Sequence, residues 1–255
     1  GGASLRHPRR KGHLFGDDDF IVCLRRRHLV AATAASGGAP CAHRATTTGA
    51  LCGCVSQRRY GVHAVCCRAG PSFLRRRSWC RDVLAAWLRE VGDGDSVLTE
   101  QRVSGRDRVT RQGIEQAVLD VVLVTNSGRV AVDVGVADAP SADDATARAR
   151  ARACGAAARE RALEKHRRYP GPGLVPAVLE TGGRMGREFR AFLRAQAFAD
   201  ERRAASLADI RQRLATALQR GVATMLLGGA GAQPRPWRTS CPALAAGAMR
   251  RRRRI

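Results

Sequence analysis

The chain has 255 residues, of which 44% are hydrophobic, so it can bury the core of one ordinary domain with appendages. Its 45 Lys and Arg residues against 22 Asp and Glu residues give a formal charge of +23, which favours a polyanionic partner such as nucleic acid. This composition excludes a chain that is only a disordered basic tail. No secretory leader and no apolar run of about 20 residues is present, so we expect no membrane partner.

The N-terminal part is basic and has little hydrophobic patterning, so we treat residues 1–35 as a basic N-terminal segment. Within it, the acidic stretch 15–20 is interpreted as a surface loop. Residues 20–30, with three consecutive arginines, are interpreted as a short basic helix.

Cysteines crowd the next part of the chain, with five of the nine at positions 41 to 67. An odd number without an export signal favours a reducing compartment and metal binding over a disulfide framework. Residue types and spacing predict a structural zinc knuckle within residues 36–72, and its ligands are Cys41, Cys52, His63 and Cys67. Cys54 and Cys66 are alternative ligands, and the other interpretation is a group of free cysteines without function.

A helix and a strand follow the knuckle. Residues 73–91 have apolar positions at four-residue steps and a basic start, which predicts an amphipathic helix. Residues 96–103 are strand-like and bring Glu100 toward the next two strands. Glu100 is either a third acid of a site or an exposed charge.

The central stretch, residues 117–136, consists of two Val-rich runs separated by turn-forming residues, which predicts a β-hairpin. If Val124 pairs with Arg129, Asp120 and Asp133 face each other with their Cβ atoms roughly 5 Å apart. At so short a distance in an apolar setting, two carboxylates repel each other unless one is protonated or a cation bridges them. A hard divalent metal fits best. The alternative is that one of the two aspartates is an ordinary surface residue near the turn and only the other belongs to a site.

An Ala-rich helix is predicted from residue 140 to about residue 168, and its small-residue stripe leads to Lys165. Only two lysines occur in the chain, so a lysine on this stripe is notable. We expect Lys165 to approach the sheet; the alternative is a lysine that reaches solvent at the helix end.

The C-terminal part contains a short edge-like strand over residues 174–179, interrupted by Pro176 and followed by Glu180. Two basic amphipathic helices are predicted at 184–203 and 207–227. We expect residues 228–255, which are rich in Gly, Ala and Pro and finish in arginines, to form a disordered basic tail.

Two acids on adjacent strands with a lysine nearby form the constellation of the PD-(D/E)xK nucleases. With Lys165 on the following helix, the order of parts resembles the zinc knuckle and restriction-like endonuclease region of site-specific non-LTR retrotransposon proteins. Twelve residues separate Asp120 from Asp133, as in that pattern. The similar stretches are LRRRHLV (24–30), RDVLAAWLRE (81–90), EQRV (100–103), AVLD (117–120), VDVGV (132–136), EKHRRYPGP (164–172) and VLETGG (178–183).

The resemblance implies an α/β fold: a restriction-endonuclease-like mixed sheet flanked by helices in residues 73–203, preceded by the knuckle and followed by a C-terminal helix at 204–227. It implies that Asp120 and Asp133, with Glu100 as a candidate third acid, hold Mg²⁺ or Mn²⁺, and that Lys165 stabilises phosphate charge. Glu180 is a further candidate site residue. Candidate nucleic-acid contacts are Arg75, Arg76, Arg77, Arg161, Arg168 and Tyr169.

The implied function is that of a DNA endonuclease that nicks target DNA so that the freed 3′-hydroxyl primes reverse transcription. The implied setting is nuclear, with DNA as partner, element RNA as a further partner and a reverse-transcriptase domain upstream. The sequence also departs from the pattern, since Val118 and Leu119 replace the usual Pro or Lys before the first acid. The alternative is therefore a catalytically inactive, zinc-containing, nucleic-acid-binding piece of a decayed element.

Overall fold

The computed structural model describes Asp19 and residues 21–24, 40–54, 62–92, 96–138, 144–197 and 203–231. Most of the predicted N-terminal segment lies outside the described residues, and of the acidic stretch 15–20 only Asp19 is described, as helical. The predicted basic helix is seen only at 21–24, which are helical. The tail from residue 232 onward is likewise outside them.

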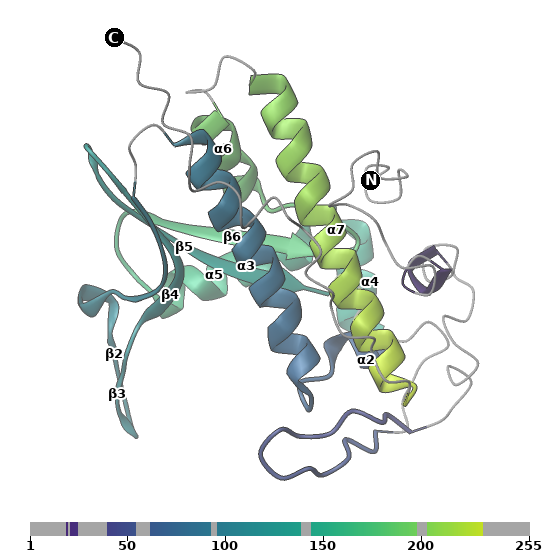
Figure 1. Ribbon diagram of the computed structural model, residues 1–255. Coiled ribbons are helices and arrows are strands. Elements are labelled where there is room, and N and C mark those ends of the chain that lie inside the picture. Colours follow the sequence, from purple (N-terminus) through teal and green to yellow (C-terminus); the bar gives the residue numbers. More distant parts are fainter. Residues whose placement is uncertain are drawn as a thin grey trace, which may run out of the picture.

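A four-stranded mixed sheet with helices on both faces forms the centre of the protein (Figure 1). The strand order is β1 (Ser96–Arg102), β4 (Val118–Thr125), β5 (Gly128–Ala137) and β6 (Leu174–Glu180). β4 pairs antiparallel with both β1 and β5, and β6 runs parallel to β5. This confirms the predicted mixed sheet flanked by helices.

The central hairpin has the predicted register. Val124 pairs with Arg129, and the β4–β5 ladder continues to Val121 and Val132. The turn closes locally because the Thr125 hydroxyl accepts a hydrogen bond from the Ser127 amide at 3.2 Å, and Gly128 adopts a φ of 135° that favours glycine.

The crossover from β5 to β6 contains two helices instead of the predicted single one. These are α4 (Asp144–Arg152) and α5 (Ala156–Arg168). The chain breaks between them because Gly155 takes a left-handed conformation with φ of 78°, which an L-residue helix cannot continue through. The edge position of β6 agrees with Pro176, which has no amide hydrogen for a further strand.

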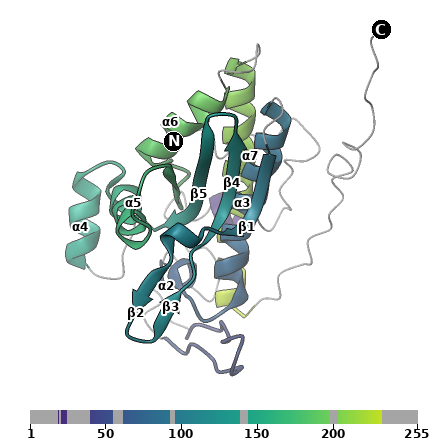
Figure 2. The same cartoon turned by 90° about the vertical axis from the view of Figure 1, so that its left-hand side faces the viewer.

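The face of the sheet opposite α5 is covered by α3 (Pro71–Val91), α6 (Arg187–Gln196) and α7 (Arg203–Gly229), as both views show (Figures 1 and 2). The largest cluster of buried apolar side chains joins these helices to the sheet, with Trp87, Phe189 and Leu214 among its members. Helix α7 therefore belongs to the main core and is not an appendage. Within the described part of the chain, no helix is both long and apolar enough to cross a membrane.

The chain segment that connects β1 to β4 forms a short hairpin, which projects from the body (Figure 2). We call residues 103–117 the arm. It contains a 3₁₀ turn (Ser104–Arg106) and two paired strands, β2 (Arg108–Thr110) and β3 (Gly113–Glu115). This second sheet was not predicted.

Candidate functional site

The four predicted knuckle ligands converge. One ligand atom from each of Cys41, Cys52, His63 and Cys67 lies within 4.8 Å of all the others. An antiparallel bridge between Arg44 and Leu51 brings the first two together. His63 lies in the short helix α2 (Val62–Cys66), and Cys67 follows its last residue. The Cys52 Sγ lies 3.3 Å from the His63 Nε2. This group could hold a metal ion such as zinc, because soft thiolate and imidazole ligands suit it.

Burial acts against charge in this cluster. It raises the pKa of Cys67 to about 12, raises the pKa of Cys41, and lowers the pKa of His63. A bound cation reverses this preference for thiols because it stabilises thiolates directly. The alternative ligand Cys66 is turned elsewhere, since its thiol donates to the Asp138 carboxylate at 2.8 Å.

The knuckle is attached to the C-terminal end of α7. The Ala42 amide donates to the Gly229 carbonyl at 3.0 Å, and a Cβ on Gly229 would lie 2.7 Å from that of Ala64. Gly228 and Gly229 thus form a close contact with the knuckle, whereas the sequence placed them in a disordered tail.

The two central carboxylates are buried on adjacent strands. Asp120 is 2% exposed and Asp133 is 5% exposed. The last pair of the β4–β5 ladder is Val121 with Val132, the immediate chain neighbours of Asp120 and Asp133. The Val134 amide donates to the Asp120 Oδ2 at 2.8 Å. The acids therefore lie where the two strands stop pairing.

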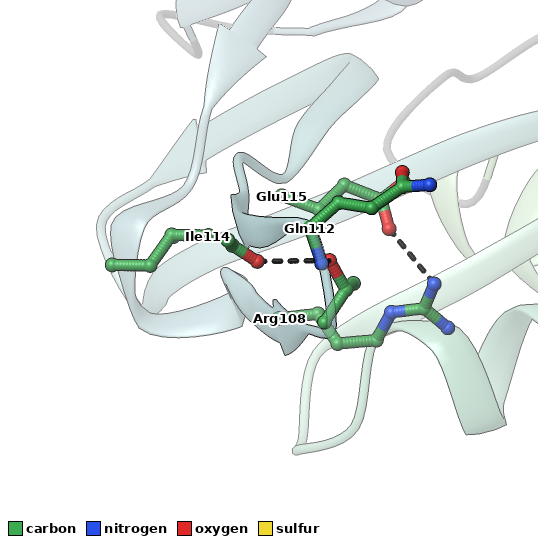
Figure 3. Close-up of a pocket in the computed structure, with 6 residues that line it drawn as sticks. Arg108, Gln112, Ile114 and Glu115 are labelled. Atoms are coloured by element: carbon green, nitrogen blue, oxygen red, sulfur yellow. Dashed lines mark hydrogen bonds and ion pairs between the residues drawn. The ribbon is translucent and has the colours of Figure 1, made fainter.

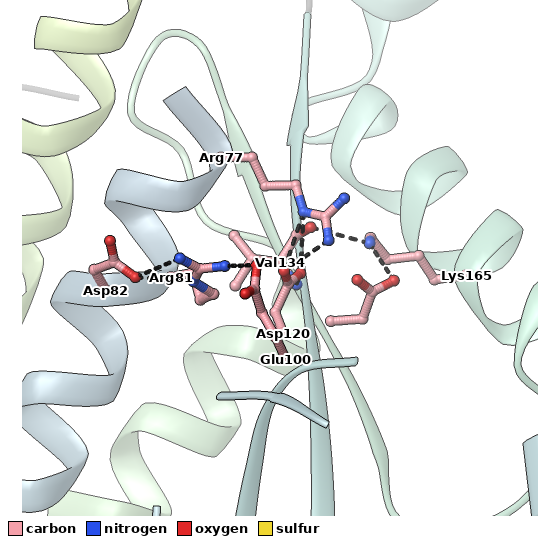
Figure 4. A network of polar contacts seen from close by, with 8 residues as sticks. Arg77, Arg81, Asp82, Glu100, Asp120, Val134 and Lys165 are labelled. Carbon is pink, nitrogen blue, oxygen red and sulfur yellow. Dashed lines mark hydrogen bonds and ion pairs between the residues drawn. The ribbon is translucent and has the colours of Figure 1, made fainter. Parts of the chain in front are cut away.

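Asp120 has an arginine partner from α3. Arg77 donates through Nε at 3.2 Å to both carboxylate oxygens and through Nη2 at 2.7 Å to Oδ1. Figure 4 shows Arg77 entering from α3 while Lys165 enters from α5 on the other side of the acids. Sequence reasoning assigned Arg77 only to nucleic acid; the missed signal is that a buried acid needs a basic partner.

Lys165 approaches the sheet, as its place on the small-residue stripe predicted. It is 5% exposed, and its Nζ lies 2.5 Å from the Asp133 Oδ2 and 3.2 Å from the Val134 carbonyl oxygen. Gly135 makes this approach feasible, because a Cβ there would lie 2.6 Å from the Lys165 Cε. The lysine side chain thus fills the space above Gly135.

Burial also shifts the ionisation of this pair. It raises the pKa of Asp133, although Lys165 opposes the shift, and it lowers the pKa of Lys165. Burial thus disfavours the charged form of each group, and the attraction between the two charges opposes it, as expected for an ion pair removed from water.

Glu100 lies opposite Asp120 in the β1–β4 register, because Thr99 pairs with Val121 and Gln101 with Leu119. Its side chain is 66% exposed and forms an ion pair with Arg81 of α3. Among the described non-glycine residues, Glu100 alone has a positive φ, 53°. The backbone thus places a third acid beside Asp120, while the carboxylate is held at the surface by Arg81.

The three consecutive arginines of α3 lie in different surroundings. Arg75 is exposed, Arg77 binds Asp120, and Arg76 is buried against α7, where a Cβ on Gly221 would lie 2.4 Å from its Cγ. This placement does not favour a phosphate contact by Arg76.

The other predicted nucleic-acid contacts lie on or after α5. Arg161 pairs with Glu164 at 2.5 Å, and Arg168 pairs with Glu115 of the arm and lies over the ring of Tyr169 at 5.4 Å. Tyr169 is buried in a small apolar cluster. Arg168 thus remains partly accessible, but Tyr169 is largely a packing residue here.

Glu180 is buried at the end of β6. It accepts a hydrogen bond from the Ala158 amide in the first turn of α5 at 3.1 Å, which places a carboxylate at the positive end of that helix. Its contact orients the helix that carries Lys165. Glu180 is therefore well placed to support the site from a distance.

A scan against models of known protein families found no match, and a search of curated proteins found none either. The resemblance to retrotransposon endonucleases therefore remains a prediction.

Proposed function

We propose that this protein is a metal-dependent DNA endonuclease that nicks one strand of a target duplex. The observation that carries the proposal is the buried group of Asp120, Asp133 and Lys165, in which two carboxylates on adjacent strands lie beside a lysine on the following helix. Side chains with these charges are costly to bury, so a purely structural role would be more cheaply filled by apolar residues.

The donor set at the strand ends fits a hard divalent cation. Asp120, Asp133 and the Val134 carbonyl offer only oxygen ligands, which Mg²⁺ and Mn²⁺ prefer, and Glu100 stands opposite Asp120 as a further acid. When bound, such an ion polarises a phosphodiester and activates water for attack. Without a bound cation, the positive charges of Arg77 and Lys165 compensate the negative charges of the two carboxylates.

Lys165 and Arg77 have different roles in this proposal. Lys165 orients Asp133 and provides a compact positive charge for a phosphate whose charge grows in the transition state. Arg77 is partly exposed, so it can hold Asp120 and contact a backbone phosphate. The chain's charge of +23 favours approach to DNA. The proposal extends to a nuclear setting beside a reverse-transcriptase domain, with element RNA as a further partner.

The test is nicking of supercoiled plasmid by the purified chain in Mg²⁺ or Mn²⁺, with parent, Asp120→Asn and Asp133→Asn compared at equal zinc content. We expect the parent to produce open circles and both variants to lose this activity while still binding DNA. The matched control is Glu90→Gln. Glu90 lies on α3 away from the site and pairs with Arg213 of α7, so this variant should nick like the parent. A folded parent without nicking, or nicking that survives both Asp substitutions, contradicts the proposal.

The second candidate function is a zinc-containing nucleic-acid-binding module without catalysis. It is favoured by the ion pairs that already compensate both acids, Asp120 with Arg77 and Asp133 with Lys165. This candidate predicts DNA binding that weakens steeply with salt, because arginine contacts release counterions, but no nicking under any metal condition.

A further inference from the structure

The arm carries an apolar pair on a surface that nothing in the described protein covers. Val109 is 84% exposed and Ile114 is 69% exposed. They are directly opposite each other in the β2–β3 register, so both side chains lie on one face of the arm. A hollow of about 460 Å³ on the arm, lined by Arg108, Thr110, Gln112, Gly113, Ile114 and Glu115, does not include Val109, and the Ile114 side chain points away from it (Figure 3).

The opposite face of the arm is polar and is attached to the end of α5. Glu115 accepts ion pairs from its cross-strand neighbour Arg108, at 2.9 Å, and from Arg168. Because strand side chains alternate between faces, Val109 and Ile114 point away from α5. The pair is therefore presented outward and not folded back on the body.

The base of the arm is held firmly. Buried Arg106 donates to the carbonyls of Tyr169 and Pro170 at 2.9 Å each and to that of Pro172. Asp107 accepts from the Ala117 amide at 2.8 Å and from Arg102 at 2.6 Å. The arm thus has a fixed position relative to the loop that follows the Lys165 helix.

The arm also starts and ends beside the acids. It departs after Arg102 and returns at Val118, and these two residues are paired two positions from Glu100 and Asp120. Its turn adds the exposed Arg111, and the arm holds three arginines against two acids. A hairpin with an excess of arginines and an exposed apolar pair in its middle, joined to the body beside a candidate phosphodiester site, has the chemistry of a wedge for duplex DNA.

We propose that the arm places Val109 and Ile114 in the minor groove of duplex DNA next to the nicked phosphodiester, where they loosen the stacking of one base step. Apolar side chains inserted in this way partly unstack a step and kink the duplex, while nearby arginines contact phosphates. The inference rests on the proposed endonuclease function, because that function supplies the DNA and the position of the cut.

The test uses the full chain with Ca²⁺ in place of Mg²⁺, so that DNA is bound without cleavage, on a duplex whose nick position has been mapped. 2-Aminopurine is placed at each step around that position, and its fluorescence reports unstacking. We expect the parent to raise fluorescence at one or two adjacent steps. The double variant Val109→Ser with Ile114→Ser should abolish the rise and weaken binding roughly tenfold, since two apolar side chains no longer leave water.

The matched control is Leu163→Ser, which changes an exposed apolar residue on α5 outside the arm and should behave like the parent. Unchanged melting temperatures show that each variant folds. If the double Ser variant binds and raises fluorescence like the parent, the arm proposal is wrong while the endonuclease proposal stands. If the variant instead alters only self-association in sedimentation, the arm contacts a second copy and not DNA. If the parent neither binds nor nicks DNA, the endonuclease proposal itself fails.

Discussion

The knuckle and the carboxylate group are two clusters of metal-ligand residue types that handle their charge in opposite ways. In the knuckle, Cys41, Cys52, His63 and Cys67 converge with their thiols favoured in the neutral form by burial. In the carboxylate group, Asp120 and Asp133 each have a cationic side chain from a flanking helix. A bound ion would supply the positive charge that the knuckle thiolates need, whereas Arg77 and Lys165 already supply positive charge to the two carboxylates.

Under the proposed function, this difference separates a structural need for metal in the knuckle from a functional need for metal at the carboxylates. The knuckle contributes only to a small apolar cluster, in which Ala64 and Val65 pack against α7, so its order should depend on the ion. The strands that carry the acids are anchored in the main core, so they should keep their positions with or without a cation. The predictions below test this separation.

The largest effect is expected from removal of the knuckle metal. Structural zinc contributes on the order of 10 kcal/mol to the folding of small zinc domains. We expect a chelator, or Cys52→Ser with Cys67→Ser, to release about one zinc per chain and to expose the knuckle backbone in hydrogen exchange. The strands β4 and β5 should stay protected, and their exposure would show that the two regions are not separate.

The next effect is on the rate of nicking when the buried lysine is replaced. Lys165→Met keeps the length and packing of the side chain but removes its charge, and loss of one such group typically lowers the rate by about 10²–10³. Lys165→Arg should recover only part of the activity, because the broad guanidinium does not fit the space above Gly135.

The control for Lys165 is the double variant Lys165→Met with Asp133→Asn, which removes both members of the ion pair. A single replacement leaves an unpaired buried charge, which lowers the free energy of unfolding by about 3–5 kcal/mol. The double variant should therefore be more stable than Lys165→Met alone. Thermal melting at neutral pH measures this. Equal stability of the two variants would mean that the pair is not coupled as described.

A smaller effect is expected at Gly135. Gly135→Ala places a methyl group 2.6 Å from the Lys165 Cε, and overpacking of this kind costs about 1–3 kcal/mol. Nicking should fall because Lys165 moves. Gly182→Ala, where a Cβ meets nothing within 4 Å, is the matched control and should be neutral. A neutral Gly135→Ala would argue against the buried position of the lysine.

The smallest effect is a displacement of the pH profile of nicking. Burial raises the pKa of Asp133, and a neutral carboxyl cannot hold a cation, so activity should fall as pH drops through that raised pKa. The acidic limb should therefore lie above the ordinary aspartate range near 4. The rate at saturating and at low Mn²⁺ measures it, and high Mn²⁺ should move the limb toward lower pH because the ion competes with the proton. A limb at the ordinary position would contradict the burial of Asp133.

The sequence by itself determined the elements whose signal is local. Alternating Val runs around a turn-forming stretch indicated the β4–β5 hairpin and its register, and the Cys/His spacing indicated the four knuckle residues that converge. The position of Lys165 on a small-residue stripe also indicated its approach to the sheet, because helical periodicity fixes which residues share a face.

Tertiary structure alone decided the partners of these residues. The pairing of Arg77 with Asp120, the burial of Arg76 against Gly221, and the attachment of the knuckle to the end of α7 join segments far apart in the chain. The break at Gly155 and the arm held by Arg106 depend on the same packing. Local patterns record the face on which a side chain lies, but which cation a buried acid meets depends on how helices dock across the sheet.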